Sequence, residues 1–511
     1  MKERITSRDK YVFLTTFLAG IVTHLYVMTN KLPAYDDLDC VRSFGGGVSL
    51  GRWLLEVLGL FKHKLLGNYS SPAFNGLLSL FFVAVAVVLF CRIFDIEFKI
   101  WQTLIGILFV VFPVLTGYMI YMYTSYYYCF ALAILMLGVY GFYLSSNGWA
   151  RLLSVLCMAG AISIYQAYLP FLISLLLIVL LVDTTKETST WKTIIRDGVI
   201  DLAIIAAVLL VYMICNKILQ IMMHVEISGM KGSNRVGSVI QEKGLGIVPY
   251  IYGTFSLPLI EDYYGLTGFV WMRIVYGIVY AVVIIAIVCL VAKSMCEKKW
   301  GISVLQMVIA LLLPLGLHSI YAMAEEQYFY TLMLYTDILV LITPVLLLQV
   351  IHSKDIIPKM SKLLSVTLAC VLCFACLFYA NQDNATYLQM DYAISGTKAY
   401  YTTVITQIKS IEEYNPNYPI VFAGTVDDPS IFDLHDTYFD QVNVGGAYGT
   451  EDMVKSIDLN LFLKQYLGFN QQVTRDAKLL DVQKVADMPC YPMPGSIQVV
   501  DKKIIVKFSN E

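Results

Sequence analysis

The chain has 511 residues, of which 58% are hydrophobic and only 14% are charged. Soluble globular proteins carry about 25% charged residues, so this composition excludes that class. Apolar stretches of about twenty residues recur along residues 1–380, and each is long enough to cross a hydrocarbon core of about 30 Å as a helix. The sequence therefore predicts an all-α polytopic membrane protein. The net charge of −2 conceals an asymmetry, because residues 381–511 hold 17 acidic and 10 basic side chains and the remainder is net basic.

Eleven apolar stretches are predicted to form transmembrane helices. The first is interpreted as a retained span and not a signal peptide, because no small-residue cleavage site follows it. The fifth and sixth stretches are short, and they are alternatively a re-entrant pair. The predicted spans are 11–29, 73–91, 100–118, 126–144, 151–165, 167–182, 198–222, 272–292, 302–321, 331–351 and 362–380.

The charges between the spans predict an orientation. Cytoplasmic loops of membrane proteins are enriched in Lys and Arg, and a cytoplasmic N-terminus places the basic residues of this chain in or beside short inner segments. The long connections 30–72 and 223–271, together with residues 381–511, then lie outside the cytoplasm. The basic residues are Lys2, Arg4, Arg8, Lys10, Arg92, Lys99, Arg151, Lys186, Lys192, Arg196, Lys293, Lys298, Lys299, Lys354 and Lys359.

One stretch of the first outer connection has a different pattern. In residues 50–66, apolar side chains recur at helical spacing and charged side chains occupy the other face. The segment is too short and too charged to span a bilayer. It predicts a helix that lies in the interface plane.

Residues 381–511 are predicted to form a small extracytoplasmic α/β domain that follows a transmembrane domain at 1–380. A helix is expected over 391–413 and a buried strand over 418–425. The segment 496–508 is typical of a hairpin with its turn at Asp501 and Lys502.

The first outer connection also contains the clearest candidates for chemistry. Asp36 and Asp37 follow the first span directly, and Arg42 and Arg52 lie shortly after them. A carboxylate is the usual general base for an attacking sugar hydroxyl, and arginine binds phosphate oxygens through paired hydrogen bonds. The alternatives are a solvated loop whose acids cap the next segment, or a divalent ion held by the two carboxylates.

Further candidates come from other outer segments. Arg235 lies in the second long connection, Glu325 precedes the tenth span, and Tyr165 and Gln166 lie between the fifth and sixth. Hydrated loops and interfacial aromatic anchors are the competing interpretations. The tyrosines of 118–128 are interpreted as anchors of this kind.

Several other sites are not supported by the sequence. The glycines of 45–47 match neither a P-loop nor a dinucleotide fingerprint, so any sugar donor should be lipid-linked. His24 and His318 stand alone in spans and favour hydrogen-bonded packing over metal ligation. No basic cluster suggests nucleic acid, and no cofactor is expected.

These features together resemble the Gtr type II glucosyltransferase family of bacterial inner-membrane enzymes. The matching features are Tyr35-Asp36-Asp37 after a first span, Gly51-Arg52-Trp53 opening a helix, and Tyr165-Gln166-Ala167-Tyr168 between later spans. A stretch from Asn381 to Asp391, a helix and the strand PIVFAG follow the last span.

The resemblance implies a GT-C-like membrane enzyme with a catalytic carboxylate in its first outer loop. It also implies transfer of glucose from a polyprenyl-phosphate carrier to a surface polysaccharide such as O-antigen, or to a lipid-linked glycan. Carried over by motif, the acidic residues are Asp36 and Asp37, and the Gly-Arg pair is Gly51 and Arg52. A transporter or flippase of lipid-linked sugar and a non-catalytic envelope-assembly protein remain the alternatives.

Overall fold

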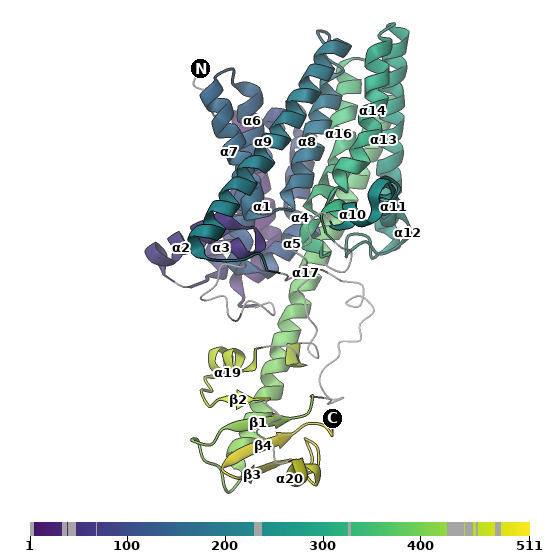
Figure 1. Ribbon diagram of the computed structural model, residues 1–511. Coiled ribbons are helices and arrows are strands. Elements are labelled where there is room, and N and C mark those ends of the chain that lie inside the picture. Colours follow the sequence, from purple (N-terminus) through teal and green to yellow (C-terminus); the bar gives the residue numbers. More distant parts are fainter. Residues whose placement is uncertain are drawn as a thin grey trace. The chain divides into compact units, whose positions relative to one another are not determined.

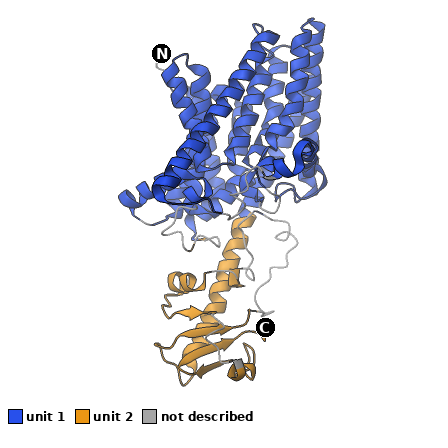
Figure 2. Cartoon of the chain, viewed as in Figure 1, with its two compact units in different colours: residues 1–31, 42–384, 441–445 blue, residues 32–41, 385–440, 446–511 orange. Residues whose placement is uncertain are grey.

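The computed structural model describes residues 5–32, 38, 47–67, 69–228, 238–324, 329–426, 444, 453–455, 458–475 and 482–510. The predicted site residues Asp36, Asp37, Arg42, Arg235 and Glu325 lie outside these described residues. The chain divides into two compact units (Figure 2), of which the first comprises residues 1–31, 42–384 and 441–445 and the second comprises the remainder. The predicted single boundary after residue 380 stays a prediction.

Unit 1 is built from helices (Figure 1). Long apolar helices dominate it, and short helices connect some of them. In chain order the elements are α1 (Ser7–Thr29), η2 (Val48–Leu50), α2 (Trp53–Leu66), α3 (Pro72–Ile93), α4 (Lys99–Val111), α5 (Pro113–Ile120), α6 (Met122–Leu144), α7 (Gly148–Ile164), α8 (Tyr168–Asp183), α9 (Trp191–Met223), α10 (Ser238–Lys243), η4 (Gly244–Gly246), α11 (Ile247–Thr254), α12 (Leu257–Ile260), α13 (Val270–Cys296), α14 (Trp300–Leu317), α15 (Ile320–Met323), η6 (Thr331–Met333), η7 (Tyr335–Asp337), α16 (Ile338–Ser353) and the first part of α17 (Pro358–Ser410).

Eight helices within the described ranges are long and apolar enough to cross a membrane, and the bent pair α4–α5 would make a ninth span. The helices α7 and α8 are apolar but shorter. The protein is therefore a mostly helical, polytopic membrane protein, and the count of eleven spans stays a prediction. The helix α2 forms within the predicted segment 50–66; its place in the membrane plane stays a prediction too.

The predicted span 100–118 is broken into α4 and α5, which meet at an angle of 40°. Pro113 has no N–H group, so the carbonyl of Phe109 loses its helical partner. The Tyr335 hydroxyl donates to that carbonyl at 2.7 Å, and Nε2 of the buried His24 donates to the next carbonyl, that of Val110, at 2.7 Å. Two side chains from distant helices thus satisfy the carbonyls that the break exposes, and the expectation of a hydrogen-bonded His24 is confirmed.

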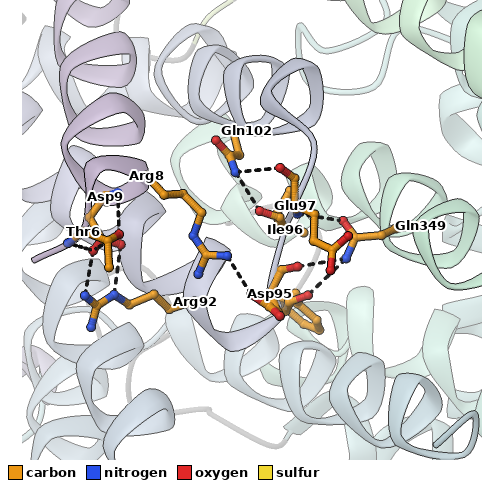
Figure 3. A network of polar contacts seen from close by, with 10 residues as sticks. Thr6, Arg8, Asp9, Arg92, Asp95, Ile96, Glu97, Gln102 and Gln349 are labelled. Atoms are coloured by element: carbon orange, nitrogen blue, oxygen red, sulfur yellow. Dashed lines mark hydrogen bonds and ion pairs between the residues drawn. The ribbon is translucent and has the colours of Figure 1, made fainter. Parts of the chain in front are cut away.

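Polar contacts join α1 to the ends of its neighbours near the N-terminus (Figure 3). Arg92 donates from Nη2 and Nε to the two carboxylate oxygens of Asp9, at 2.7 and 3.0 Å. Arg8 pairs with the exposed Asp95 at 2.6 Å. The ion pair between Arg92 and Asp9 is the more buried of the two, with side-chain exposures of 16% and 6%.

The helix α17 differs from the prediction because it is a single 53-residue helix. The sequence analysis expected a separate helix over 391–413 after the last span. No proline or glycine occurs between Pro358 and Gly396, so the polar stretch from Asn381 onward contains no residue that would end the helix.

Unit 2 contains the second part of α17 and a four-stranded sheet of order β2-β1-β4-β3. β1 is parallel to both neighbours, and β3 and β4 form an antiparallel hairpin. The hairpin turn lies at Asp501 and Lys502, both with positive φ, as the sequence predicts. The remaining elements are β1 (Ile420–Ala423), α19 (Leu459–Leu467), β2 (Val473–Thr474), α20 (Val482–Ala486), β3 (Ile497–Val500) and β4 (Lys503–Lys507).

Candidate active site

Three of the predicted site residues lie in the described structure, and the fold brings them together. Arg52 precedes α2, whereas Tyr165 and Gln166 form the turn between α7 and α8. More than a hundred residues separate the two segments, so their contact is a product of the tertiary fold.

The turn before Arg52 requires glycine. The short helix η2 ends at Gly51, which has a φ of +75°. A Cβ atom at Gly51 would lie 2.5 Å from the Tyr212 hydroxyl and 2.9 Å from Nε2 of Gln166. Both the left-handed backbone and the close packing therefore exclude a side chain at this position.

Gln166 ties this turn to two other parts of the fold. Its Nε2 atom donates to the carbonyl of Leu50 at 2.7 Å and to the Tyr212 hydroxyl, on α9, at 3.4 Å. The backbone N–H of Ser228 donates to the carbonyl of Ser49 at 2.8 Å. The turn is thus held by the α7–α8 connection and by the segment that follows α9, as well as by its own backbone.

Glu56 holds the other end of the turn. Its carboxylate accepts from the backbone N–H of Val48 at 2.9 Å, and a Cβ atom on Gly47 would lie only 1.7 Å from the same oxygen. Glu56 therefore serves the backbone, and it forms no ion pair with Arg52.

The guanidinium of Arg52 lies among tyrosines. Nη1 donates to the Tyr128 hydroxyl at 3.2 Å, and Cζ lies 5.3 Å from the centroid of the Tyr165 ring, which is within cation–π range. The rings of Tyr128 and Tyr165 stack at 4.5 Å. Burial opposes the charge, but the surrounding tyrosine hydroxyls, that of Tyr128 foremost, hold the pKa of Arg52 above its ordinary value.

The guanidinium has unused binding capacity. Its Nε atom is buried and makes no hydrogen bond. Among the described residues no carboxylate forms an ion pair with Arg52, in contrast to Arg92 with Asp9. A fixed, uncompensated cation with free N–H donors has the properties of a site for a phosphate or another anion.

The tyrosines predicted as interfacial anchors behave differently. Tyr118 and Tyr128 are only 1% and 5% exposed, so for these two the prediction is wrong. Tyr118 packs against Tyr165 at 5.9 Å and stacks on Tyr335 at 5.8 Å. The sequence pattern of an aromatic belt and that of an aromatic core are alike, because both place tyrosines near the end of a span.

The helix α9 adds polar side chains that the sequence analysis did not identify. Asn216 and Gln220 follow Tyr212 at intervals of one turn and are 8% and 7% exposed. Oδ1 of Asn216 and Nε2 of Gln220 are buried without a hydrogen-bond partner. Their i, i+4 spacing after Tyr212 was the available signal. Most of α9 is exposed, because only 17% of its most apolar 18-residue stretch is buried.

Two further carboxylates of unit 1 are deeply buried. Asp383 is fully buried, neither of its oxygens has a hydrogen-bond partner, and Thr116 of α5 lies beside it. Asp337 is 2% exposed and lies 3.5 Å from Nε2 of His318, whose Nδ1 contacts the Thr254 hydroxyl at 3.1 Å. The sequence analysis did not identify Asp383, although its position just past the last apolar stretch was a signal.

The structure contains no site built for a metal ion among the residues it describes, where no group of three or more His, Cys, Asp or Glu side chains converges. Asp36 and Asp37, the pair for which a divalent ion was the alternative, lie outside those residues. The chemistry visible in the structure is therefore that of Arg52 and its aromatic and amide neighbours.

A family model described as glucosyl transferase GtrII matches residues 25–341, more than half of the chain. The protein belongs to the GtrII glucosyltransferase family. The match includes Arg52 with its supports Gln166 and Tyr212, and it ends before α17. No curated protein and no solved structure matches the chain. GtrII membership and the apolar helices together identify a membrane glucosyltransferase.

Proposed function

We propose that this GtrII protein transfers glucose from a polyprenyl-phosphate carrier to a cell-envelope glycan, such as O-antigen, on the extracytoplasmic side of the bacterial inner membrane. The observation that carries the proposal is the guanidinium of Arg52, which has no ion-pair partner among the described residues and which Gly51, Gln166, Tyr128 and Tyr165 hold in place. A donor with a phosphate next to the sugar matches such a cation.

In the proposed reaction an acceptor hydroxyl attacks the anomeric carbon of glucose. The new C–O bond forms as the bond to the carrier phosphate breaks, and the electron pair leaves with the polyprenyl phosphate. Arg52 stabilises the negative charge that grows on this leaving group, and a preorganised donor of this kind contributes about 10²–10³-fold in rate. The configuration at the anomeric carbon is inverted.

The proton of the acceptor hydroxyl passes to Asp36 in this scheme, and Asp37 orients Asp36 or the acceptor sugar. Arg42 and Arg235 are second candidates for the phosphate, and Glu325 for the sugar. The support for these roles is chemical type, predicted topology and, for the two aspartates, the family motif. Among the described residues, Asn216 and Gln220 are suited to bind sugar hydroxyls. Each has a buried amide atom without a hydrogen-bond partner, and they lie one and two turns beyond Tyr212.

The test is transfer of labelled glucose from a polyprenyl-phosphate donor by purified protein in detergent. Arg52→Ala should lower kcat by about 10²–10³-fold, whereas Arg52→Lys should retain part of the rate because it keeps the charge and loses the paired donors. Lys64→Ala is the matched control, since Lys64 is an exposed cation on α2, the helix that follows Arg52. Full activity of Arg52→Ala would contradict the phosphate role.

The same assay separates the alternatives. A flippase or an assembly protein would form no new glycosidic bond in micelles, where translocation has no meaning. Asp36→Asn should lower turnover by about 10²–10⁴-fold, and a folded variant with near wild-type transfer would remove Asp36 from the role of base.

A further inference from the structure

A polar pocket lies at the C-terminal end of α8, whereas the Arg52 site lies at the start of that helix. Its volume is about 570 Å³, and its lining comes from the ends of α8, α13, α14 and α16 and from the connections beside them. Positive-charge counting predicts that this end faces the cytoplasm. The pocket therefore lies where the headgroups of the inner leaflet should be, far from the chemistry proposed above.

The lining of the pocket includes a buried amide. Gln306 is 1% exposed, and its Nε2 atom donates to the Thr184 hydroxyl at 3.1 Å. Its Oε1 atom is buried and has no hydrogen-bond partner. An orphaned buried acceptor is destabilising, so a ligand that brings an N–H or O–H donor to this point would be stabilised.

The rim of the pocket carries charges of both signs. Glu297 accepts from Lys299 at 2.9 Å and lies 3.4 Å from Lys293, so one carboxylate is shared between two lysines. Lys354 and Glu187 also line the pocket, and neither has an ion-pair partner among the described residues. The lining thus holds three lysines and two glutamates, and Lys354 and Glu187 remain for a ligand beside the orphaned acceptor of Gln306.

We propose that this pocket binds the zwitterionic headgroup of a phospholipid with a primary amine, of the phosphatidylethanolamine type. Lys354 contacts the phosphate, and the ammonium group, with three N–H donors, satisfies Glu187 and Oε1 of Gln306. Basic pockets between helices at the cytoplasmic surface are a known mode of headgroup binding, and the volume lies within the range of about 300–1,000 Å³ that is usual for small-molecule sites.

The chemistry of the pocket sets the order of preference among lipids. A choline headgroup has the same phosphate but no N–H donor, and it therefore leaves Oε1 of Gln306 unsatisfied. A glycerol headgroup brings hydroxyl donors but no charge for Glu187. Phosphatidylethanolamine should consequently bind more tightly than phosphatidylcholine or phosphatidylglycerol.

The experiment is native mass spectrometry of the delipidated full-length protein, titrated in detergent with dioleoyl phosphatidylethanolamine, phosphatidylcholine or phosphatidylglycerol. We expect at least one ethanolamine lipid to be retained about tenfold more tightly than the choline lipid, as the loss of one charge-assisted contact implies. Gln306→Leu should abolish that preference, whereas Lys354→Ala should weaken the retention of all three lipids, because each of them carries the phosphate. Lys359→Ala is the matched control, because Lys359 is an exposed lysine nearby that does not line the pocket.

Equal retention of the three lipids would overturn the proposal, since it indicates non-specific annular binding. A preference for phosphatidylglycerol would overturn the assignment of the amine. Soluble glycerophosphoethanolamine that competes fully would show a water-soluble ligand in place of a lipid. Glucosyl transfer in detergent should be unchanged in Lys354→Ala, so this result is independent of the proposed function.

Discussion

Gly51 and Arg52 depend on each other, because the arginine can reach its tyrosine neighbours only from a turn that no side chain occupies. Gly51 has a positive φ, and a Cβ atom there would clash with Tyr212 and Gln166. These two constraints fix the point from which α2 begins. A pair of this kind can be recognised in a sequence as a motif. Its partners cannot, since Gln166 and Tyr212 are distant in the chain and have no local signature.

Gly51→Ala should therefore impair glucosyl transfer, although residue 51 itself contacts no substrate in the proposed reaction. The left-handed backbone costs an alanine about 1–2 kcal/mol, and the clash with Tyr212 moves Arg52 away from Tyr128 and Tyr165. We expect kcat to fall by about 10-fold or more, a part of the effect of deleting the guanidinium itself, together with a lower Tm in a thermal-shift assay.

The control for this variant is Gly253→Ala on α11, where a Cβ atom meets nothing within 4 Å. Alanine favours a helix over glycine by about 1 kcal/mol, so this variant should be as stable as the wild type or more so. Equal activity of the two glycine variants would show that the turn before Arg52 tolerates a side chain.

At the scale of elements, the break between α4 and α5 positions Tyr118 against the tyrosines near Arg52. Pro113 ends the helical hydrogen bonding, the Tyr335 hydroxyl and His24 take over the freed carbonyls, and α5 then places Tyr118 against Tyr165. The sequence predicts the apolar stretch but not the break, because a proline within a transmembrane segment is tolerated whenever neighbouring side chains satisfy the backbone.

Tyr335→Phe tests this account of the break. The variant keeps the ring contacts but leaves the Phe109 carbonyl buried without a donor, which should lower the free energy of unfolding by about 1–3 kcal/mol. Thermal denaturation in detergent measures the loss. Tyr69→Phe removes a hydroxyl from a side chain that is 59% exposed and should be neutral; a loss as large as that of Tyr335→Phe would refute the account.

The two ion pairs near the N-terminus give a matched comparison between buried and exposed contacts. Arg92→Ala leaves the carboxylate of Asp9, with 6% of its side chain exposed, without its partner, and a broken buried pair costs about 3–5 kcal/mol. Arg8→Ala breaks a pair in which Asp95 is 75% exposed, and such pairs contribute about 0–1 kcal/mol.

The thermal stability of both arginine variants is measured, together with that of the double variant Asp9→Asn/Arg92→Ala. The double variant separates the loss of the contact from the cost of leaving Asp9 charged and unpaired. The double variant should regain part of the stability that Arg92→Ala loses. If Arg8→Ala lowers the thermal stability as much as Arg92→Ala does, burial does not explain how much the contact with Asp9 contributes.

At the scale of the whole molecule, the sequence predicts where helices and strands occur better than it predicts where one helix continues into the next. The hairpin at Asp501 and Lys502 and the strand at 420–423 have local turn and strand signals, and both form. The single helix α17 was missed because polar composition after Asn381 resembles a linker, although no helix-breaking residue is present. The buried positions of Tyr118 and Asp383 follow from packing among helices that are far apart in the chain.

The orientation of the chain in the membrane is testable with its own cysteines. Cys296 is exposed at the C-terminal end of α13, on the side predicted to be cytoplasmic, and Cys490 belongs to unit 2. A membrane-impermeant maleimide added to intact cells should label the Cys490 peptide in mass spectra and should reach Cys296 only after permeabilisation. The reverse pattern would invert the topology and place Arg52 on the cytoplasmic side.

The open faces of α9 have a consequence for how the proposed donor arrives. Apolar side chains along this helix are exposed, among them Leu202 at 67% and Leu210 at 54%, and the same helix ends its apolar run near Tyr212, which contacts Gln166. A prenyl tail that diffuses laterally in the bilayer can follow this helix to the guanidinium without leaving hydrocarbon. Encounter with substrate would then be a two-dimensional search, and its rate would scale with the carrier's surface density in the membrane and not with any aqueous concentration.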